Sequence, residues 1–170
     1  MNIKEVQENH LHYKPDFIFA STSEVYGEPF ELPSTEKAIT YLRIDEKRDS
    51  YAAAKLMSEF YVKLFCESLN INWIIFRIFN VYGSGEYFKA KTSSMVIQLS
   101  HQILDDKPPH LVENSTQISR DFIFIEDVIQ ANIKACTSSI NGTYNVGTGI
   151  SRNFQEIANI LQKELGTDLG

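Results

Sequence analysis

The apolar positions of this chain fall into short runs and helical stripes that follow one another along its length. Phe17 to Ala20 is a short apolar run typical of a buried strand, and a second such run extends from Ile71 to Ile78. Between them, apolar residues recur three and four positions apart, which predicts a helix that begins after Ser50 as its cap. We expect the large apolar residues of this helix to pack into the core, and they are Leu56, Met57, Phe60, Tyr61, Leu64 and Phe65. Two strands joined by a helix predict a parallel crossover.

Further elements are predicted downstream and at the amino end. Helical spacing of apolar residues recurs in three later segments, which are residues 93–104, 126–136 and 154–165. The last of these helices is expected to stop at Gly166, and residues 120–125 alternate enough to form a strand. Residues 2–12 predict the end of a helix that Pro15 closes.

Polar residues follow both predicted strands at the point where each strand ends. Residues 21–27 carry hydroxyls and a carboxylate after the first strand, and residues 80–83 follow the second. In open α/β sheets, ligands bind at the carboxyl ends of the strands. The sequence therefore predicts a ligand site at this edge of the sheet.

Tyr51 and Lys55 lie in the first turns of the predicted helix, near those strand ends. Four-residue spacing on a helix stacks the phenol beside the ammonium, which would favour the phenolate and make the tyrosine a usable base. The spacing alone is not specific, because Tyr87 and Lys91 share it.

Five segments together carry a more specific pattern, and they are residues 20–27, Tyr51 with Lys55, residues 76–83, residues 120–128 and residues 144–149. With these segments in this order, the chain resembles the extended short-chain dehydrogenases that act on nucleotide sugars, namely the epimerases, dehydratases and decarboxylases. The strongest resemblance is to the ADP-glycero-manno-heptose 6-epimerases, because Asn80 is followed by a lysine-bearing loop over residues 86–95.

The resemblance implies an α/β fold with a Rossmann-type parallel sheet that lacks its amino-terminal dinucleotide-binding strands, together with part of a small substrate-binding region. Residues 1–83 are expected to form the carboxyl-terminal part of the Rossmann domain, and residues 84–170 a mixture of substrate-binding and remaining Rossmann elements. None of the 8 glycines forms a Gly-x-Gly-x-x-Gly loop after a strand. We therefore expect an internal fragment of a longer protein.

Catalytic roles follow from chemistry and from the resemblance. Oxidation of a secondary alcohol needs a base and a hydride acceptor, and no side chain accepts hydride, so a nicotinamide cofactor, NADP or NAD, is expected. Tyr51 is the candidate base, and the resemblance implies that Lys55 holds the nicotinamide ribose. Thr22 matches the family's hydroxyl that bonds the reacting alcohol, although it could equally cap the strand-to-loop turn.

Two further residues are candidates for proton transfer. Epimerisation requires proton transfer on two faces of the sugar, and the resemblance implies Lys89 as the second acid/base. Glu24 matches the acid/base of dehydratases and decarboxylases. A solvated surface charge is the alternative for both residues.

Cofactor and substrate contacts are implied for several other residues. Val81 and Lys89 join Tyr51 and Lys55 as expected cofactor contacts. Asn80 and Arg120 suit phosphate oxygens, with an ion pair to Asp121 or Glu126 as the alternative for Arg120. The remaining expected substrate contacts are Lys91, Gln98, Glu113 and Ser115.

Composition is that of an ordinary globular protein. The 170 residues are 43% apolar and 22% charged, enough for one sizeable core, and no apolar run is long enough to span a membrane. The net charge of −6 argues against a nucleic-acid partner. Cys66 and Cys136 predict two buried free thiols in a reducing, cytoplasmic compartment. His10 and His12 have no supporting ligands, so no metal is expected.

The sequence therefore predicts a nucleotide-sugar epimerase that oxidises and re-reduces a sugar carbon with NAD(P), as a homo-oligomer in its full-length form. One alternative is a sugar-nucleotide 4,6-dehydratase or decarboxylase, favoured by residues 22–24. The other is a non-catalytic remnant that binds a nucleotide sugar or a partner, favoured by the missing glycine-rich loop.

Overall fold

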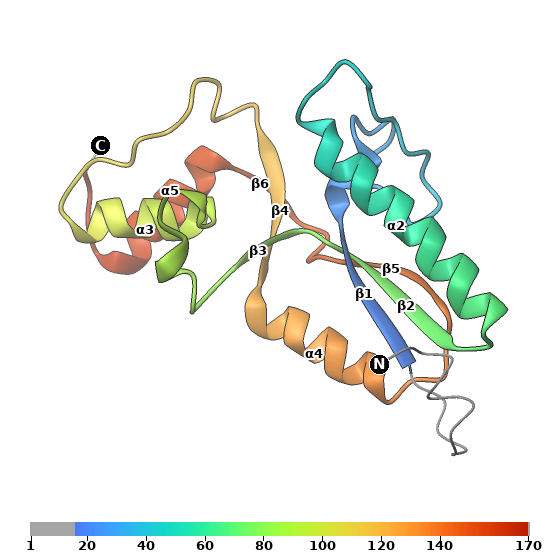
Figure 1. The fold of residues 1–170 in the computed structure, drawn as a ribbon. Coiled ribbons are helices and arrows are strands. Elements are labelled where there is room, and N and C mark those ends of the chain that lie inside the picture. Colours follow the sequence, from blue (N-terminus) through green and yellow to red (C-terminus); the bar gives the residue numbers. More distant parts are fainter. Residues whose placement is uncertain (1–15, 170) are drawn as a thin grey trace. The chain divides into compact units, whose positions relative to one another are not determined.

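The computed structural model describes residues 16–169, apart from the side chains of Asp16, Tyr87, Ala90 and Lys91, and divides the chain into two compact units (Figure 1). The first unit combines the chain up to Arg77 with Asn132–Asn145, and the second combines Ile78–Ala131 with the chain from Val146. The helix predicted for residues 2–12 and the His10–His12 pair lie outside the described residues. The functional division expected at residue 83 stays a prediction.

The first unit is built on a parallel sheet with the strand order β1-β2-β5. The strands are β1 (Asp16–Thr22), β2 (Asn72–Ile78) and β5 (Gly142–Val146), and helix α2 (Asp49–Ser68) connects the first two (Figure 1). The five central residues of β2 are all buried, as expected for a central strand of a parallel sheet. The two strands, the helix between them and the α/β class were all predicted correctly.

Helix α2 begins at Asp49, one residue before Ser50, its predicted cap. Arg48 at the cap position already has helical angles and makes no side-chain cap bond. Ser50 lies inside the helix, and its hydroxyl donates backward to the Lys47 carbonyl at 2.8 Å. The cap role predicted for Ser50 is therefore wrong.

The large apolar stripe of α2 faces away from the sheet. Five side chains in it are each more than half exposed, and they are Met57, Phe60, Tyr61, Leu64 and Phe65. The buried face instead carries Ala52, Glu59 and Cys66. The predicted core packing is wrong for these five residues, whereas the sixth predicted residue, Leu56, is half-buried. A buried ion pair made by Glu59 lies on the opposite face of the helix, which is the face turned toward the sheet.

The core of the first unit lies between that face of α2 and the sheet. It contains Cys66, Ile71, Trp73 and Ile75, with Phe19, Val62 and Leu69 packed around them. Each large side chain buried here stabilises the unit by about 1.5–3 kcal/mol. The sheet and the helix are thus held by apolar contacts at the end of α2 that lies far from Tyr51.

A short 3-10 helix, η1 (Ser23–Tyr26), follows β1 and leads into Gly27. Gly27 has φ +63°, and a Cβ at this position would lie 1.7 Å from the Tyr41 carbonyl oxygen. The Tyr41 N–H donates to the Tyr26 carbonyl at 3.1 Å, which brings the two backbones together. A glycine is therefore required where the chain leaves the end of β1.

The second unit contains a small sheet with the order β3-β4-β6. Its strands are β3 (Asn80–Tyr82), β4 (Ser119–Phe124) and β6 (Ser151–Asn153). Strands β3 and β4 are parallel, whereas β4 and β6 are antiparallel, with Arg120 directly opposite Arg152.

Helices α3 (Met95–Leu104) and α5 (Phe154–Leu165) pack together in the second unit, around Val96, Leu99, Ile157 and Ala158 (Figure 1). A short 3-10 helix, η2 (Tyr87–Thr92), precedes α3. Gly166 ends α5 in the left-handed conformation, as predicted.

Helix α4 (Ile125–Cys136) begins in the second unit and ends in the first. Its last residue, Cys136, is exposed, whereas Cys66 is buried, and both thiols are free. The predicted burial of Cys136 is wrong because it stands at the end of the helix, where the chain turns away.

Candidate active site

Thr22 closes β1 and caps η1. Its Oγ1 accepts a hydrogen bond from the Glu24 N–H at 3.2 Å, which is the capping role left open by the sequence. Its own O–H has no acceptor among the described residues, so capping leaves that proton available to a ligand. Glu24 is exposed in the first turn of η1.

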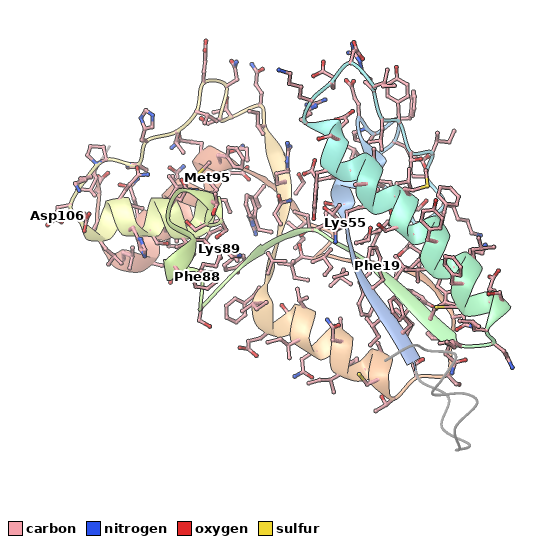
Figure 2. The ribbon with its side chains drawn as sticks, viewed as in Figure 1. Phe19, Lys55, Phe88, Lys89, Met95 and Asp106 are labelled. Atoms are coloured by element: carbon pink, nitrogen blue, oxygen red, sulfur yellow. The ribbon has the colours of Figure 1, made fainter. Side chains whose placement is uncertain are left out.

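Lys55 reaches back from α2 to the end of β1 (Figure 2). Its Nζ donates to the Ala20 carbonyl at 2.7 Å and lies 4.9 Å from the centre of the Phe19 ring. The same ammonium lies 5.9 Å from the centre of the Tyr51 ring, within cation–π range. The structure therefore brings Lys55 and the half-exposed Tyr51 together at a strand end, and their catalytic roles stay predictions.

A buried ionic network anchors α2 one turn after Lys55. The Glu59 carboxylate accepts from Ser21 Oγ at 2.5 Å and from Arg77 Nη2 at 2.7 Å. Although burial opposes its charge, hydrogen bonds to Glu59 raise the pKa of the Arg77 guanidinium above its ordinary value. Sequence reasoning missed this network, and its one signal was an arginine inside the apolar run of β2.

Arg77 also fixes the segment after β1. Its guanidinium lies 4.9 Å from the centre of the Tyr26 ring and donates to the Glu36 carbonyl at 3.3 Å. The Tyr26 hydroxyl donates to Asn145 Oδ1 at 2.6 Å. The end of β1, η1 and α2 are thus connected through one guanidinium, close to Thr22 and Lys55 in the sequence.

In the second unit, Asn80 and Asp121 organise the ends of two strands. Asn80 Nδ2 donates to the Asp121 carbonyl at 3.0 Å. The Asp121 carboxylate accepts from Thr148 Oγ1 at 2.6 Å, from the Thr148 N–H at 3.0 Å and from the Gly149 N–H at 2.8 Å. Asp121, which the sequence offered only as a partner for Arg120, therefore holds the loop after β5.

Arg120 is exposed on β4 and donates to the Ser119 carbonyl at 2.8 Å. Within residues 16–169 it makes no ion pair with Asp121 or Glu126, so the predicted alternative is not formed. Arg152, which sequence reasoning missed, is exposed directly opposite it. Like charges opposite each other on paired strands are unfavourable, and an anion between them would remove that cost.

The segment that carries Lys89 is held by Glu86, another residue given no role from the sequence. The buried Glu86 carboxylate accepts from the Gly83 N–H at 3.2 Å and from the Ser94 N–H at 2.7 Å. Although burial disfavours its charge, hydrogen bonds from Ser94 and Gly83 hold the pKa of the Glu86 carboxyl below its ordinary value. Lys89 Nζ lies 3.9 Å from Glu86 Oε2, with its side chain 47% exposed.

The other predicted contacts also belong to the second unit. Val81 is half-buried in β3, and Gln98 Nε2 donates to the Ser93 carbonyl at 2.7 Å. Glu113 is exposed and Ser115 is half-buried in the turns before β4, while Lys91 lies in η2 with its side chain outside the description. Tyr51, Lys55, Thr22 and Glu24 belong to the first unit. Each unit therefore carries one set of the predicted residues.

The nicotinamide end of a dinucleotide fits the first unit, where an ammonium, a phenol and a hydroxyl gather at the end of β1. The pyrophosphate end has no cradle in residues 16–169, because none of the described glycines stands in a glycine-rich turn from a strand into a helix.

In the described part of the chain no three His, Cys, Asp or Glu residues come together as a metal site. None of the described helices has the length and apolar character needed to cross a membrane.

Comparison with known proteins gives one family. The NAD dependent epimerase/dehydratase family model matches residues 4–147. UDP-N-acetylglucosamine 4-epimerase from Methanobrevibacter ruminantium M1, solved with UDP-N-acetylmuramic acid, is 30% identical, with a TM-score of 0.81 over 91% of this chain and 48% of that one. ADP-L-glycero-D-manno-heptose-6-epimerase from Helicobacter pylori is 36% identical, with a TM-score of 0.75 over 90% of this chain and 46% of that one.

A dehydratase is similar as well. The NAD dependent NDP-hexosamine 5,6-dehydratase of tunicamycin biosynthesis is 25% identical, with a TM-score of 0.74 over 89% of this chain and 48% of that one. The chain thus spans about half the length of these solved proteins.

These similarities confirm the predicted family and the Rossmann-like fold class. They also confirm the cofactor class, because the family depends on NAD(P). Epimerases acting at two different sugar carbons and a dehydratase all share the fold. The similarities therefore identify the family and do not single out one reaction within it. The chain belongs to the NAD dependent epimerase/dehydratase family.

Proposed function

We propose that this chain is the catalytic portion of a nucleotide-sugar epimerase that oxidises and re-reduces one sugar carbon, with an ADP-heptose-like substrate. The observation that carries the proposal is Lys55, whose ammonium is bonded to the end of β1 and lies over the Tyr51 ring. Identity of 36% to a heptose 6-epimerase supports the choice of substrate.

In this proposal Tyr51 takes the proton of the sugar hydroxyl. The ammonium of Lys55 lies 5.9 Å from the centre of the ring that carries this phenol, and Thr22 would donate its O–H to the same hydroxyl oxygen. NAD(P), when bound, supplies the hydride acceptor and later the hydride donor. The residues that would hold it are Tyr51, Lys55, Val81 and Lys89.

Lys89 is proposed as the acid/base on the second face of the keto sugar. Its side chain is half-exposed, and its ammonium has one carboxylate, Glu86, at 3.9 Å. Asn80 and Arg120, together with Arg152, would hold the diphosphate of the substrate, because amide and guanidinium N–H groups suit phosphate oxygens. Further proposed substrate contacts are Lys91, Gln98, Glu113 and Ser115.

The test is Tyr51→Phe in the enzyme that contains this chain. Turnover should fall below detection while nucleotide-sugar binding stays nearly intact, because only the phenolic hydroxyl that transfers the proton is removed and the ring still packs. Tyr61→Phe is the matched control, since Tyr61 is an equally exposed phenol on the same helix. Wild-type turnover in Tyr51→Phe would refute Tyr51 as the base.

A sugar-nucleotide dehydratase or decarboxylase is the second candidate, supported by the exposed carboxylate of Glu24 beside Thr22. Lys89→Ala should cost about 10²–10⁴-fold in activity in an epimerase, far more than Glu24→Gln. The reverse ranking, or a product lighter by one water, would favour the dehydratase.

The 170 residues contain no glycine-rich dinucleotide loop. For residues 1–170 alone we expect no tight NADP binding and no turnover. Titration calorimetry that showed tight NADP binding would mean that other residues build the cofactor site.

We also infer that the parent protein is a homo-oligomer in the cytoplasm. The exposed stripe of α2 points directly away from the sheet, so a helix packed beside α2 on the same sheet would leave the stripe uncovered. Five half-exposed large side chains offer about 500 Å² per copy, and about 1,000 Å² for two copies reaches the lower limit of a specific interface. Two free thiols suit a reducing compartment.

A further inference from the structure

The segment between β3 and α3 carries Lys89 (Figure 2), and the buried carboxylate of Glu86 connects its two ends. Glu86 Oε1 accepts from the Gly83 N–H at 3.2 Å, where β3 has just ended, and from Ser94 Oγ at 2.9 Å. Glu86 Oε2 accepts from the Ser94 N–H at 2.7 Å, at the cap of α3. A single side chain therefore joins the beginning and the end of the segment.

Lys89 contacts the Glu86 clamp, by which we mean the Glu86 carboxylate with its bonds to Gly83 and Ser94, through its backbone and its side chain. The Lys89 N–H donates to the Glu86 carbonyl at 2.9 Å, and the Lys89 carbonyl accepts from Thr92 Oγ1 at 2.7 Å. The ammonium lies 3.9 Å from Glu86 Oε2. Movement of Glu86 would thus displace both ends of the lysine residue.

We propose that Glu86 is the positioning residue for Lys89, which it holds in the place and orientation needed for proton transfer to the sugar. This inference rests on the proposed function of Lys89. Glu86 itself is 9% exposed, and both of its oxygens are engaged by protein donors, so it acts through Lys89 and has no direct part in the chemistry.

The geometry requires a carboxylate of this length. Among the described residues, the groups that contact the Glu86 carboxylate are all donors, namely the Gly83 N–H, the N–H and O–H of Ser94, and the Lys89 ammonium. A glutamine would turn N–H groups toward the Ser94 N–H and the ammonium. An aspartate is one methylene too short to reach both Gly83 and Ser94.

The first test is limited trypsin digestion of the folded chain, with cleavage after Lys89 followed by mass spectrometry. Glu86→Gln should speed this cleavage about tenfold or more, because the segment opens more often when the clamp is lost. Glu46→Gln is the matched control: Glu46 also pairs with a cation three residues away at 3.9 Å, but its side chain is 42% exposed.

The second test is turnover in the complete enzyme. Glu86→Gln should lower kcat about 10–100-fold and leave KM unchanged, because the affected group supports a reacting residue and does not bind substrate. Ser94→Ala removes one donor to Glu86, together with the hydroxyl that caps α3, and is the second variant should Glu86→Gln not fold. Ser94→Thr keeps the hydroxyl and should restore both cleavage resistance and kcat.

Wild-type cleavage and kcat in both Glu86→Gln and Ser94→Ala would overturn the proposal. Faster cleavage with an unchanged kcat, in an enzyme that Lys89→Ala inactivates, would also overturn it. Full activity of Lys89→Ala would instead overturn the proposed function of Lys89, and the cleavage rates would then still decide whether Glu86 holds the segment.

Discussion

The carboxylate of Glu59 on α2 and the guanidinium of Arg77 on β2 form a buried, multiply bonded ion pair. Arg77 Nη2 donates to Oε2 at 2.7 Å and Nε donates to Oε1 at 3.1 Å, with side chains that are only 9% and 7% exposed for the arginine and the glutamate. Glu59 follows Lys55 by one helical turn on the same face. The pair therefore sets how far along the sheet α2 lies, and with it where Lys55 and Tyr51 are presented.

Removal of the charge on Glu59 should destabilise the first unit strongly. Glu59→Gln leaves the Arg77 guanidinium buried without a counter-ion, which typically costs about 3–5 kcal/mol. Urea unfolding followed by circular dichroism measures this loss. The control Glu67→Gln, at an exposed position of the same helix, should change stability by less than about 0.5 kcal/mol. Equal midpoints for the two variants would show that the pair does not stabilise the fold.

Glu86 should make stability depend on pH. Hydrogen bonds keep its folded-state pKa below the ordinary value of 4.5, so its contribution is fully present above that value and is lost as the pH falls through the folded-state pKa. The difference in unfolding free energy between wild type and Glu86→Gln should therefore stay constant from neutral pH to about pH 4.5 and shrink below it. A difference that stayed constant down to strongly acidic pH would contradict this linkage.

The two thiols should differ widely in reactivity. Cys66 is 6% exposed, and burial raises the pKa of its thiol, so little thiolate is present near neutral pH. Cys136 is exposed at the end of α4. Titration with Ellman's reagent should give one fast thiol, which Cys136→Ser removes, and a second thiol only in denaturant. Two fast thiols in the native protein would show that Cys66 is accessible.

Arg120 and Arg152 should contribute to the binding of a diphosphate. Loss of a charge-assisted hydrogen bond costs about 1.5–3 kcal/mol, so Arg120→Ala should weaken ADP binding in calorimetry by roughly 10–150-fold. Arg152→Ala should weaken ADP binding less than Arg120→Ala does, because Arg152 acts across the strand pair. The loss of affinity in Arg152→Ala should be larger at low salt, where charges are less screened. Arg43→Ala, which removes an exposed arginine of the other unit, is the control. Unchanged affinity in Arg120→Ala would exclude it as an anchor.

The stripe of α2 should determine association. Phe60→Asp and Leu64→Asp place charges on the outward face and should shift the protein toward monomer in sedimentation velocity, with little loss of fold because both residues are exposed. Ile44→Asp, at a fully exposed apolar position outside α2, is the matched control. An unchanged sedimentation coefficient in both α2 variants would exclude this face as the interface.

Local signals explain which parts of the fold were predictable. The end of α5 was correct because a glycine in the left-handed conformation is required at that point of the chain itself. The orientation of α2 was not, because periodicity identifies a stripe without identifying what covers it. The buried partner of Arg77 lies on another element, and no spacing rule connects Glu59 to β2.

The site shows the same division. The proximity of Tyr51 and Lys55 follows from helical geometry, and it was predictable from four-residue spacing. Glu86 received no role from the sequence and Asp121 only that of a partner for Arg120, because both residues act by accepting backbone N–H groups across loops. Which N–H groups a loop presents depends on its backbone path, and that path is fixed only by tertiary structure.

The passage of α4 from one unit to the other has a consequence for synthesis on the ribosome. Strand β5, which completes the first sheet, is translated only after the whole stretch Ile78–Ala131 of the second unit has been made. A nascent chain ending near Arg77 therefore has β1, α2 and β2 but no partner for the free edge of β2, and Tyr26 has no Asn145 to bond. During that interval β2 exposes unpaired backbone groups to other chains, so the nascent chain can associate through this edge until β5 is made.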